Sequence, residues 1–230
     1  MKVKLLRYTP NPEITCALAA QTSYSTKYYD ERKEKMTLEK ARKTLRKVIG
    51  YGHVSVIEHA SFTFALEDVS RVLEIQLVRH RLASYTIKSG RYNKAHCDIV
   101  IPPKIAKNEK ALKKLNEFVE QNTKIIQDLL DMGIPFEDVR MLSPQGIKTN
   151  IIVTMNAREL LHFFNLRCCA RAQWELRVVA DEMLKQVKRV APVIFEKAGP
   201  SCIALGYCPE GELKPETCNL IEIKMKFSSM

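Results

Sequence analysis

The sequence predicts an α+β fold, a single domain in which a mostly antiparallel sheet is flanked by long helices. Short segments that alternate apolar and polar residues favour strands, and longer amphipathic segments favour helices. The chain has 230 residues, a length that one hydrophobic core can serve. Because no linker, internal repeat or low-complexity segment divides it, we expect one domain over residues 1–230, with a cysteine-containing tail from about residue 199.

The N-terminal half contains two strand patterns and two helix patterns. Residues 1–8 alternate basic and apolar side chains, and residues 61–66 alternate phenylalanine with small polar side chains, as half-buried strands do. Thr37 is a suitable N-cap for an amphipathic helix that ends just before Gly50. A short serine-capped helix over 70–81, followed by a polar loop, is expected next.

The C-terminal half is richer in helix. Residues 98–101 favour a short strand, and residues 104–132 favour a long amphipathic helix. Residues 147–155 form the last strand pattern. Helical sequence then runs over 156–197, with Pro192 expected to break or kink it.

Composition restricts the classes of partner. The chain has 37 Lys and Arg against 26 Asp and Glu, a formal net charge of +11. This surplus favours an anionic partner, which could be nucleic acid, an acidic membrane or phosphorylated small molecules. A transmembrane helix is not expected, because no run of about 18 apolar residues occurs. With no secretory signal and 7 cysteines, we expect reduced thiols and a cytoplasmic location.

The densest polar cluster spans residues 76–92. Its first part spaces Gln76, Arg79 and His80 at i, i+3 and i+4, so that one helix face presents all three. Its second part is rich in serine, glycine and arginine, whose hydroxyl, backbone N–H and guanidinium groups suit phosphate oxygens. A plainer interpretation is a basic helix end, where cations stabilise the last carbonyls.

Residues 52–59 contain two histidines and a glutamate, a combination that suggests a metal site. His53 and His59, however, lack the i, i+4 spacing of a helical metal pair. Ser55 can cap a short turn that Glu58 completes as a capping box. We therefore expect no metal here, and a structural or ligand-contacting role.

Residues 156–174 form a mostly apolar helix pattern that carries several cations. Asn156 is expected to cap the helix, with Glu159 in the capping-box position. The pairs at i, i+4 are Arg158 with His162, and Arg167 with Arg171. Arginines on an apolar helix contact either neighbouring carboxylates or a ligand.

Together these segments resemble the flavin-dependent thymidylate synthases. The family signature is Arg-His-Arg, about seven residues, then Ser, and here Arg79-His80-Arg81 precedes Ser89, followed by Gly90-Arg91-Tyr92. Further similar segments are Gly52 to His59, Ser61-Phe62-Thr63-Phe64, Asn156-Ala157-Arg158, Asn165-Leu166-Arg167 and Ala172-Gln173-Trp174-Glu175. The resemblance keeps the family order from about Ser23 to Glu175.

The resemblance implies an α+β homotetramer with active sites between subunits. It also implies that FAD, NADPH and methylenetetrahydrofolate serve to convert dUMP to dTMP. The FAD contacts that it implies are Ser55, Glu58, Arg79, His80, Arg81, Asn156, Arg158 and His162. The dUMP contacts that it implies are Gln76, Arg79, Ser89, Gly90, Arg91, Arg140 and Arg167.

Arg167 is the expected catalytic residue. The C5 atom of a uracil is a poor nucleophile, and a guanidinium that stabilises negative charge as N3 ionises enriches C5 in electrons. Because arginine stays protonated, it cannot itself be the base. The flavin would carry the hydride chemistry.

Thr86 and Ile87 depart from the resemblance, since the family often has a polar pair there. A buried polar partner of Ile87 would be left unsatisfied at a cost of about 1–3 kcal/mol, and restoring Glu or Gln would raise turnover if the departure is a defect. A second candidate function is therefore a paralogue that binds FAD and a nucleotide with lost or altered methylation.

A basic nucleic-acid-binding protein also fits the charge. The sequence has no helix-turn-helix, zinc-finger or RNA-binding signature, however, and we expect neither a dedicated nucleic-acid partner nor a membrane. The tail cysteines Cys202, Cys208 and Cys218 do not have zinc-ribbon spacing. A disulfide or a three-cysteine metal site in the tail stays open at this point.

Overall fold

The centre of the molecule is a four-stranded sheet in the order β1-β2-β4-β3, with every pairing antiparallel. We describe residues 1–89 and 98–230 from a computed structural model. The strands are β1 (Lys2–Tyr8), β2 (Ser61–Ser70), β3 (Ala83–Ile87) and β4 (Lys148–Asn156). The predicted α+β class with an antiparallel sheet is confirmed.

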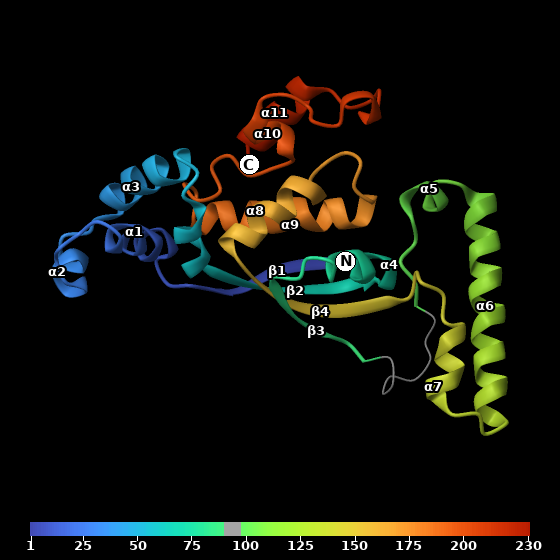
Figure 1. Ribbon diagram of the computed structural model, residues 1–230. Helices are drawn as coiled ribbons and strands as arrows, with labels where there is room; N and C mark the ends of the chain where they lie inside the picture. The colour runs from blue at the N-terminus through green and yellow to red at the C-terminus, as the bar shows by residue number, and fades with distance from the viewer. Residues whose placement is uncertain (90–97) are drawn as a thin grey trace.

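Helices cover one face of this sheet and extend beyond both of its ends (Figure 1). The face is covered by α8 (Ala157–Arg167) and α9 (Trp174–Val190). One end carries α1 (Pro12–Thr22), α2 (Tyr29–Glu34), α3 (Leu38–Gly50) and the 3-10 turn η1 (Val54–His59). The short α4 (Arg71–Leu77) follows β2.

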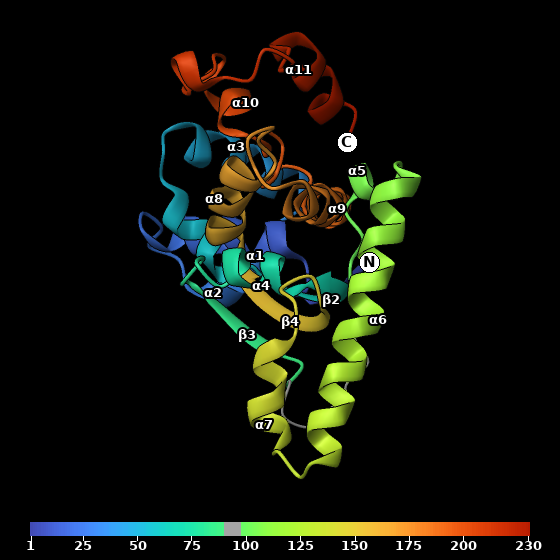
Figure 2. The ribbon, with the colours of Figure 1, turned by 90° about the vertical axis from the view of Figure 1, so that its right-hand side faces the viewer.

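The other end carries a helical arm, which stands apart from the helix layer in Figure 1 and extends below the sheet in the view of Figure 2. The arm consists of α5 (Pro103–Ala106), α6 (Glu109–Asp131), α7 (Phe136–Val139) and the 3-10 turn η2 (Arg140–Leu142). The C-terminal residues form α10 (Ser201–Leu205), the 3-10 turn η3 (Gly211–Leu213) and α11 (Leu220–Ser228), which lie over α8 and α9.

The core lies between the sheet and the helix layer because strand side chains alternate between faces. Phe62, Phe64 and Leu66 of β2 point into it and are fully buried, as is Val153 of β4. On the opposite face the hydroxyls of Thr63 and Thr154 form a hydrogen bond of 2.9 Å. Ile152, on the same face, is partly exposed. Among the described residues no helix covers that face (Figure 1).

The prediction of a polar loop after residue 81 is wrong, because residues 83–87 form the strand β3. The short helix ends at Leu77, and β3 pairs with β4 along its whole length. Ala83, Tyr85 and Ile87 pack against the core while the two residues between them are exposed. The alternation is present in the sequence, but the hydroxyl side chains on the outer face make the segment look like a loop.

Other boundaries also differ from the sequence prediction. The helix pattern over 156–197 is two helices, because the chain turns between Arg167 and Trp174 and Gln173 caps α9. α9 ends before Pro192. The long helix of the arm begins only at Glu109, capped by Asn108, and the strand expected over 98–101 is a single bridge from Ile99 to Ile147.

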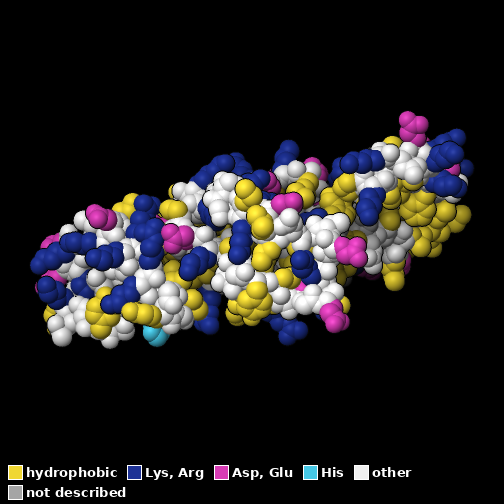
Figure 3. Space-filling model, turned by 90° about the horizontal axis from the view of Figure 1, so that it is seen from above, with side chains coloured by type: hydrophobic (Ala, Val, Ile, Leu, Met, Phe, Trp, Pro, Cys, Tyr) yellow, Lys and Arg dark blue, Asp and Glu magenta, His cyan; other side chains and the backbone are white. Residues whose placement is uncertain are grey.

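Positive charge is spread over the surface rather than collected in one stripe. The face drawn in Figure 3 carries Lys and Arg side chains over much of its length, most densely toward α2 and α3, and apolar side chains toward the arm. Within the described residues, no helix is both long and apolar enough to cross a membrane.

Candidate active site

The turn that bears Arg79 and His80 follows α4, and a buried glutamate fixes the start of that helix. The Ser70 Oγ accepts the Leu73 N–H at 3.1 Å and so caps α4. Glu175, 1% exposed, accepts the Ser70 backbone N–H at 2.8 Å and its hydroxyl at 2.5 Å. Because Glu175 lies in the first turn of α9, it holds α4 against the helix layer.

The start of α8 places a second group of functional side chains. Asn156 caps the helix as predicted, since its Oδ1 accepts the Glu159 N–H at 2.9 Å. The Glu159 carboxylate is 6% exposed and is directed toward His80. Arg158 and His162 share an exposed side of the same helix. One helix therefore presents a guanidinium and an imidazole outward and a carboxylate inward.

An exposed ion pair connects α8 to η1. Arg158 Nη1 lies 2.5 Å from Glu58 Oε1, and both side chains are about half exposed. Such a pair contributes little to stability, roughly 0–1 kcal/mol. It does bring Glu58 and Arg158 together at the surface, with Ser55 exposed on the same 3-10 turn. Three of the residues expected to contact a cofactor thus lie in one region.

A buried chain of hydrogen bonds runs from Arg167 through His80 to Glu159. Arg167 Nε lies 3.0 Å from His80 Nε2, and His80 Nδ1 lies 3.2 Å from Glu159 Oε1. His80 is 4% exposed, and its ring also packs edge-on against Phe163 and His162. The Arg-His-Arg motif therefore directs its histidine inward, whereas Arg79 and Arg81 are exposed.

The geometry assigns the tautomer of His80. An arginine Nε–H can only donate, so His80 Nε2 must accept and Nδ1 must carry the proton that is donated to Glu159. Burial, with the nearby Arg167 and His162, lowers the pKa of His80 from 6.5 to about 4. Burial also raises the pKa of Glu159, which His162 partly opposes, and lowers that of Arg167. His80 is thus neutral at pH 7.

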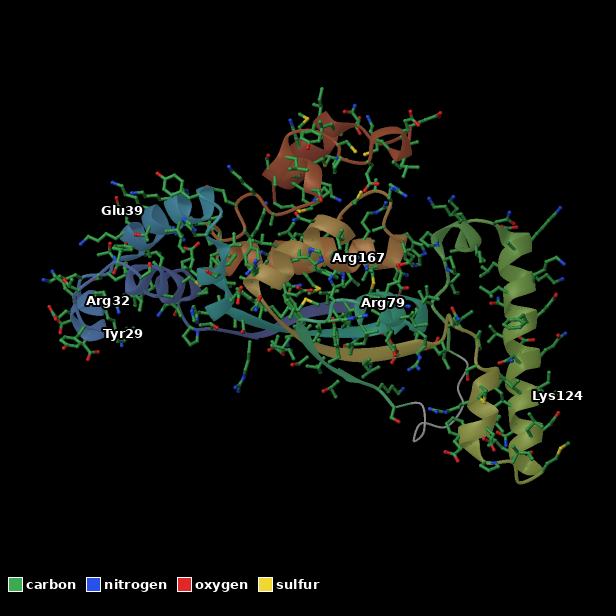
Figure 4. The ribbon with its side chains drawn as sticks, viewed as in Figure 1. Tyr29, Arg32, Glu39, Arg79, Lys124 and Arg167 are labelled. Atoms are coloured by element: carbon green, nitrogen blue, oxygen red, sulfur yellow. The ribbon has the colours of Figure 1, made fainter. Side chains whose placement is uncertain are left out.

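Arg167 is held by two contacts at the end of α8. Besides the bond to His80, its Nη2 lies 3.4 Å from the backbone oxygen of Gln76. The Gln76 amide itself donates to the Val72 carbonyl at 3.2 Å. Figure 4 shows Arg79 and Arg167 on facing elements between the helix layer and the α4 turn. The structure therefore brings Gln76, Arg79 and Arg167 to one place.

Tyr85 is a site residue that the sequence analysis missed. Its hydroxyl oxygen lies 2.9 Å from the backbone oxygen of Leu77 and 2.8 Å from that of His80, so its single O–H is shared between these two acceptors. The contact of Glu159 with His80 was also missed, because the capping-box position already gave Glu159 a structural role. A carboxylate on the buried side of an apolar helix is a signal that could have indicated a buried partner.

The nucleotide-contact candidate Ser89 lies two residues beyond the end of β3 and is exposed. Gly90 and Arg91 lie outside the described residues. Ile87 points to the core side, opposite Ile151 in the register, and Thr86 is exposed on the other face. The aliphatic side chain at position 87 therefore packs against the apolar core.

Arg140 is not brought to the other candidate residues within one chain. It follows α7 in the arm, where its Nε donates to the Glu137 backbone oxygen at 3.2 Å. Both ribbon views place α7 beside α6, away from α8 (Figures 1 and 2).

The cysteines offer thiols rather than cross-links in the described part of the chain. Six described cysteines are free. Cys202 and Cys218 have raised pKa values, first because of burial and then because neighbouring cysteines lie close. Among the described residues, no group of three or more His, Cys, Asp or Glu side chains could hold a metal ion.

The arrangement defines a class of site, namely an arginine-rich surface on an α+β frame. Within the described residues neither Arg79 nor Arg81 has a carboxylate within ion-pair distance. Exposed guanidiniums of this kind suit phosphate oxygens. Arg167, held by a neutral histidine, presents its terminal nitrogens beside them.

Comparison with known proteins identifies the family. Residues 4–193 match the family model Thy1, described as thymidylate synthase complementing protein. Curated relatives named flavin-dependent thymidylate synthase come from Geobacter sulfurreducens, 46% identical over 100% of this chain and 99% of the relative, and Pyrococcus horikoshii, 46% identical over 95% and 93%. A third, from Clostridium tetani, is 45% identical over 93% and 92%. The chain belongs to the flavin-dependent thymidylate synthase family, and it is an enzyme.

Proposed function

We propose that this enzyme converts dUMP to dTMP with FAD as cofactor, methylenetetrahydrofolate as carbon donor and NADPH as reductant. The relatives' shared name supports thymidylate synthesis and a flavin. The observation that carries the proposal in this chain is the placement of Arg167, hydrogen-bonded to a neutral His80, beside exposed arginines. We assign the enzyme to the cytoplasm, where its free thiols stay reduced.

The chemistry of the available side chains fits a flavin dinucleotide. The proposed FAD contacts are Ser55, Glu58, Arg79, Arg81, Asn156, Arg158 and His162. His80 is buried beneath this surface. Arg79, Arg81 and Arg158 supply guanidiniums for a pyrophosphate. The helix cap uses only the Asn156 Oδ1, so its amide N–H₂ can face a ligand. When bound, FAD would supply the hydride that completes the methyl group.

The nucleotide is proposed to bind on the Arg167 side. The proposed dUMP contacts are Gln76, Arg79, Ser89, Gly90, Arg91, Arg140 and Arg167. Arginine side chains would hold the 5′-phosphate, and the Arg167 guanidinium would stabilise the negative charge that develops as N3 ionises. Electron density delocalised to C5 then makes this carbon the nucleophile that accepts the methylene.

We further propose that the enzyme is a homotetramer with sites shared between subunits. One chain leaves Arg140 on the arm, remote from Arg167. The arm also exposes large apolar side chains, with Phe118 48%, Ile125 51% and Met141 83% exposed. A second copy that covers this surface would carry Arg140 to the neighbouring site. The residues from about 199 form a tail appended to the proposed domain.

The absorbance of the bound flavin tests the proposed function directly. The purified protein is loaded with FAD and its absorbance is followed under anaerobic conditions as NADPH is added, with and without dUMP. We expect the flavin band to bleach faster when dUMP is present, and methylenetetrahydrofolate then to yield dTMP. A protein that takes up no FAD, or that reduces flavin but never forms dTMP, would contradict the proposal.

A further inference from the structure

We propose that His80 is a positioning residue for Arg167: it accepts the Arg167 Nε–H at Nε2 while Glu159 holds its Nδ1–H. The proposal rests on the function proposed above for Arg167. It assigns to the histidine of the Arg-His-Arg motif a role different from contact with the flavin.

The burial of His80 supports this assignment. At 4% exposure the ring has almost no surface for a ligand. Both of its nitrogens are engaged inside the chain, one with Arg167 and one with Glu159. The backbone oxygen of His80 is also engaged, because it accepts the Tyr85 hydroxyl at 2.8 Å. A ligand would have to displace one of these contacts to reach the side chain.

The bond geometry shows what His80 does to Arg167. A guanidinium carries five N–H groups in one plane. His80 accepts the Nε–H, and the Gln76 backbone oxygen accepts from Nη2 at 3.4 Å. Two acceptors on one edge fix the plane of the group, and the Nη1 end remains directed away from them. A bidentate or charge-stabilising contact depends on that orientation.

Glu159 keeps His80 in the form that the bond requires. A histidine protonated on both nitrogens can only donate, so it would face the Arg167 Nε–H without a lone pair. The carboxylate accepts the Nδ1–H and leaves the lone pair on Nε2. The charged and titratable groups that face the ring are Glu159, Arg167 and His162. The ring therefore transmits the position of Glu159 to the guanidinium.

Three substitutions of His80 separate the two ring nitrogens. Glutamine places an amide oxygen near the position of Nε2, so His80→Gln keeps an acceptor for Arg167. Asparagine reaches only the position of Nδ1, so His80→Asn keeps a partner for Glu159 and leaves Arg167 without one. His80→Phe keeps the ring packing against Phe163 and removes both bonds. Lys43→Gln, on an exposed residue of α3 outside the proposed site, is the control.

The measurement is turnover per bound flavin, together with flavin content and thermal stability. We expect the kcat of His80→Asn and His80→Phe to fall about 100-fold, the size of effect of a misplaced catalytic group. His80→Gln should keep most of the activity, Lys43→Gln all of it, and flavin content should change little in any variant. The proposal is overturned if His80→Asn matches or exceeds His80→Gln, or if flavin content falls while turnover per flavin stays constant.

A spectroscopic measurement keeps the proposal testable if those variants do not fold. In the wild-type enzyme, ¹⁵N-labelled histidine should give one buried imidazole that is protonated on Nδ1 and stays neutral well below pH 6.5. Glu159→Leu should leave the Nδ1–H without its acceptor and change its ¹⁵N chemical shift, whereas Glu159→Gln, which keeps an acceptor oxygen, should preserve that shift. A His80 that is protonated on Nε2 would overturn the proposal. An enzyme that makes no dTMP but has this tautomer would instead contradict the proposed function alone.

Discussion

At the residue scale, the proposed chemistry is concentrated in Arg167. Replacing it with lysine keeps the positive charge but removes the Nε–H that His80 accepts and the planar guanidinium. Because loss of one such charge-stabilising group costs about 10²–10³ in kcat, we expect Arg167→Lys to lose nearly as much activity as Arg167→Gln. Initial rates of dTMP formation at saturating dUMP measure the loss. A lysine variant with full turnover would show that charge alone is sufficient.

His80 predicts a pH dependence of stability. Its pKa is lowered from 6.5 to about 4 in the folded chain, so between these values the unfolded chain binds more protons. The contribution of His80 to the free energy of unfolding is therefore fully present above pH 6.5 and lost as pH falls through about 4.

The measurement is urea unfolding of wild type and His80→Gln at about pH 7, which lies above this window, and at about pH 6 and 5, which lie within it. The difference in the free energy of unfolding between the two proteins should shrink toward low pH, because the variant has no histidine to protonate. A difference that is constant or grows with acidity contradicts the assigned burial.

Ile87 stands where the family often has a polar residue, and its packing in the structure explains why an aliphatic side chain fits there. Its side chain packs against the core, with Ile151 opposite. We expect Ile87→Glu to destabilise the protein by about 1–3 kcal/mol, the cost of an unsatisfied buried polar group, and not to raise turnover. Ile87→Val is the control, at about 0.5–1.5 kcal/mol. A glutamate variant that is as stable as wild type and turns over faster would show that Ile87 lowers the activity of this enzyme.

At the element scale, the position of α4 depends on one buried carboxylate. Glu175→Leu would leave the Ser70 N–H and hydroxyl without their acceptors. The expected loss is about 1–3 kcal/mol in the free energy of unfolding, and Glu175→Gln should lose less because its amide keeps one acceptor oxygen. Urea unfolding compares them. Equal stability of all three proteins would mean that the contact does not anchor α4.

The elements also show what sequence could and could not predict. Three predicted caps were accurate, since Thr37, Ser70 and Asn156 each accept a backbone N–H at the start of a helix. The cap expected from Ser55 was wrong, because η1 begins at Val54 and no side chain caps it. Capping is local, so a few residues determine it. β3 was missed because its outer face is polar and its partner, β4, is distant in sequence. Strand pairing is non-local, and local composition therefore misleads.

The same distinction applies to the candidate site. Local spacing was enough to predict that Arg158 and His162 share a face of α8. It could not show that His80 turns inward to Glu159, since that pair joins residues 79 positions apart. Pairing between distant elements is what sequence patterns do not contain.

At the scale of the whole molecule, the proposed sharing of sites predicts complementation between inactive variants. Arg140→Ala and Arg167→Ala should each be nearly inactive as pure proteins. If their residues meet only across subunits, mixed oligomers contain some sites with both arginines, and activity returns on co-expression. Pure proteins mixed without subunit exchange are the control. Mixed oligomers that stay inactive would place both residues in one subunit's site.

The oligomer itself is open to a separate measurement. A homotetramer of 26.4 kDa chains should have four times that mass by light scattering, and replacing Phe118 and Ile125 of the arm by serine should reduce it. An active wild-type monomer would contradict the proposed assembly.

The most direct test of the central claim is a single-turnover reaction. Enzyme with bound FAD is reduced anaerobically with NADPH and mixed with dUMP and methylenetetrahydrofolate, and dTMP is quantified per bound flavin. We predict about one dTMP per reduced flavin, with none from Arg167→Gln and none from enzyme stripped of flavin. Formation of dTMP without flavin, or its absence from the fully loaded wild-type enzyme, would contradict the account.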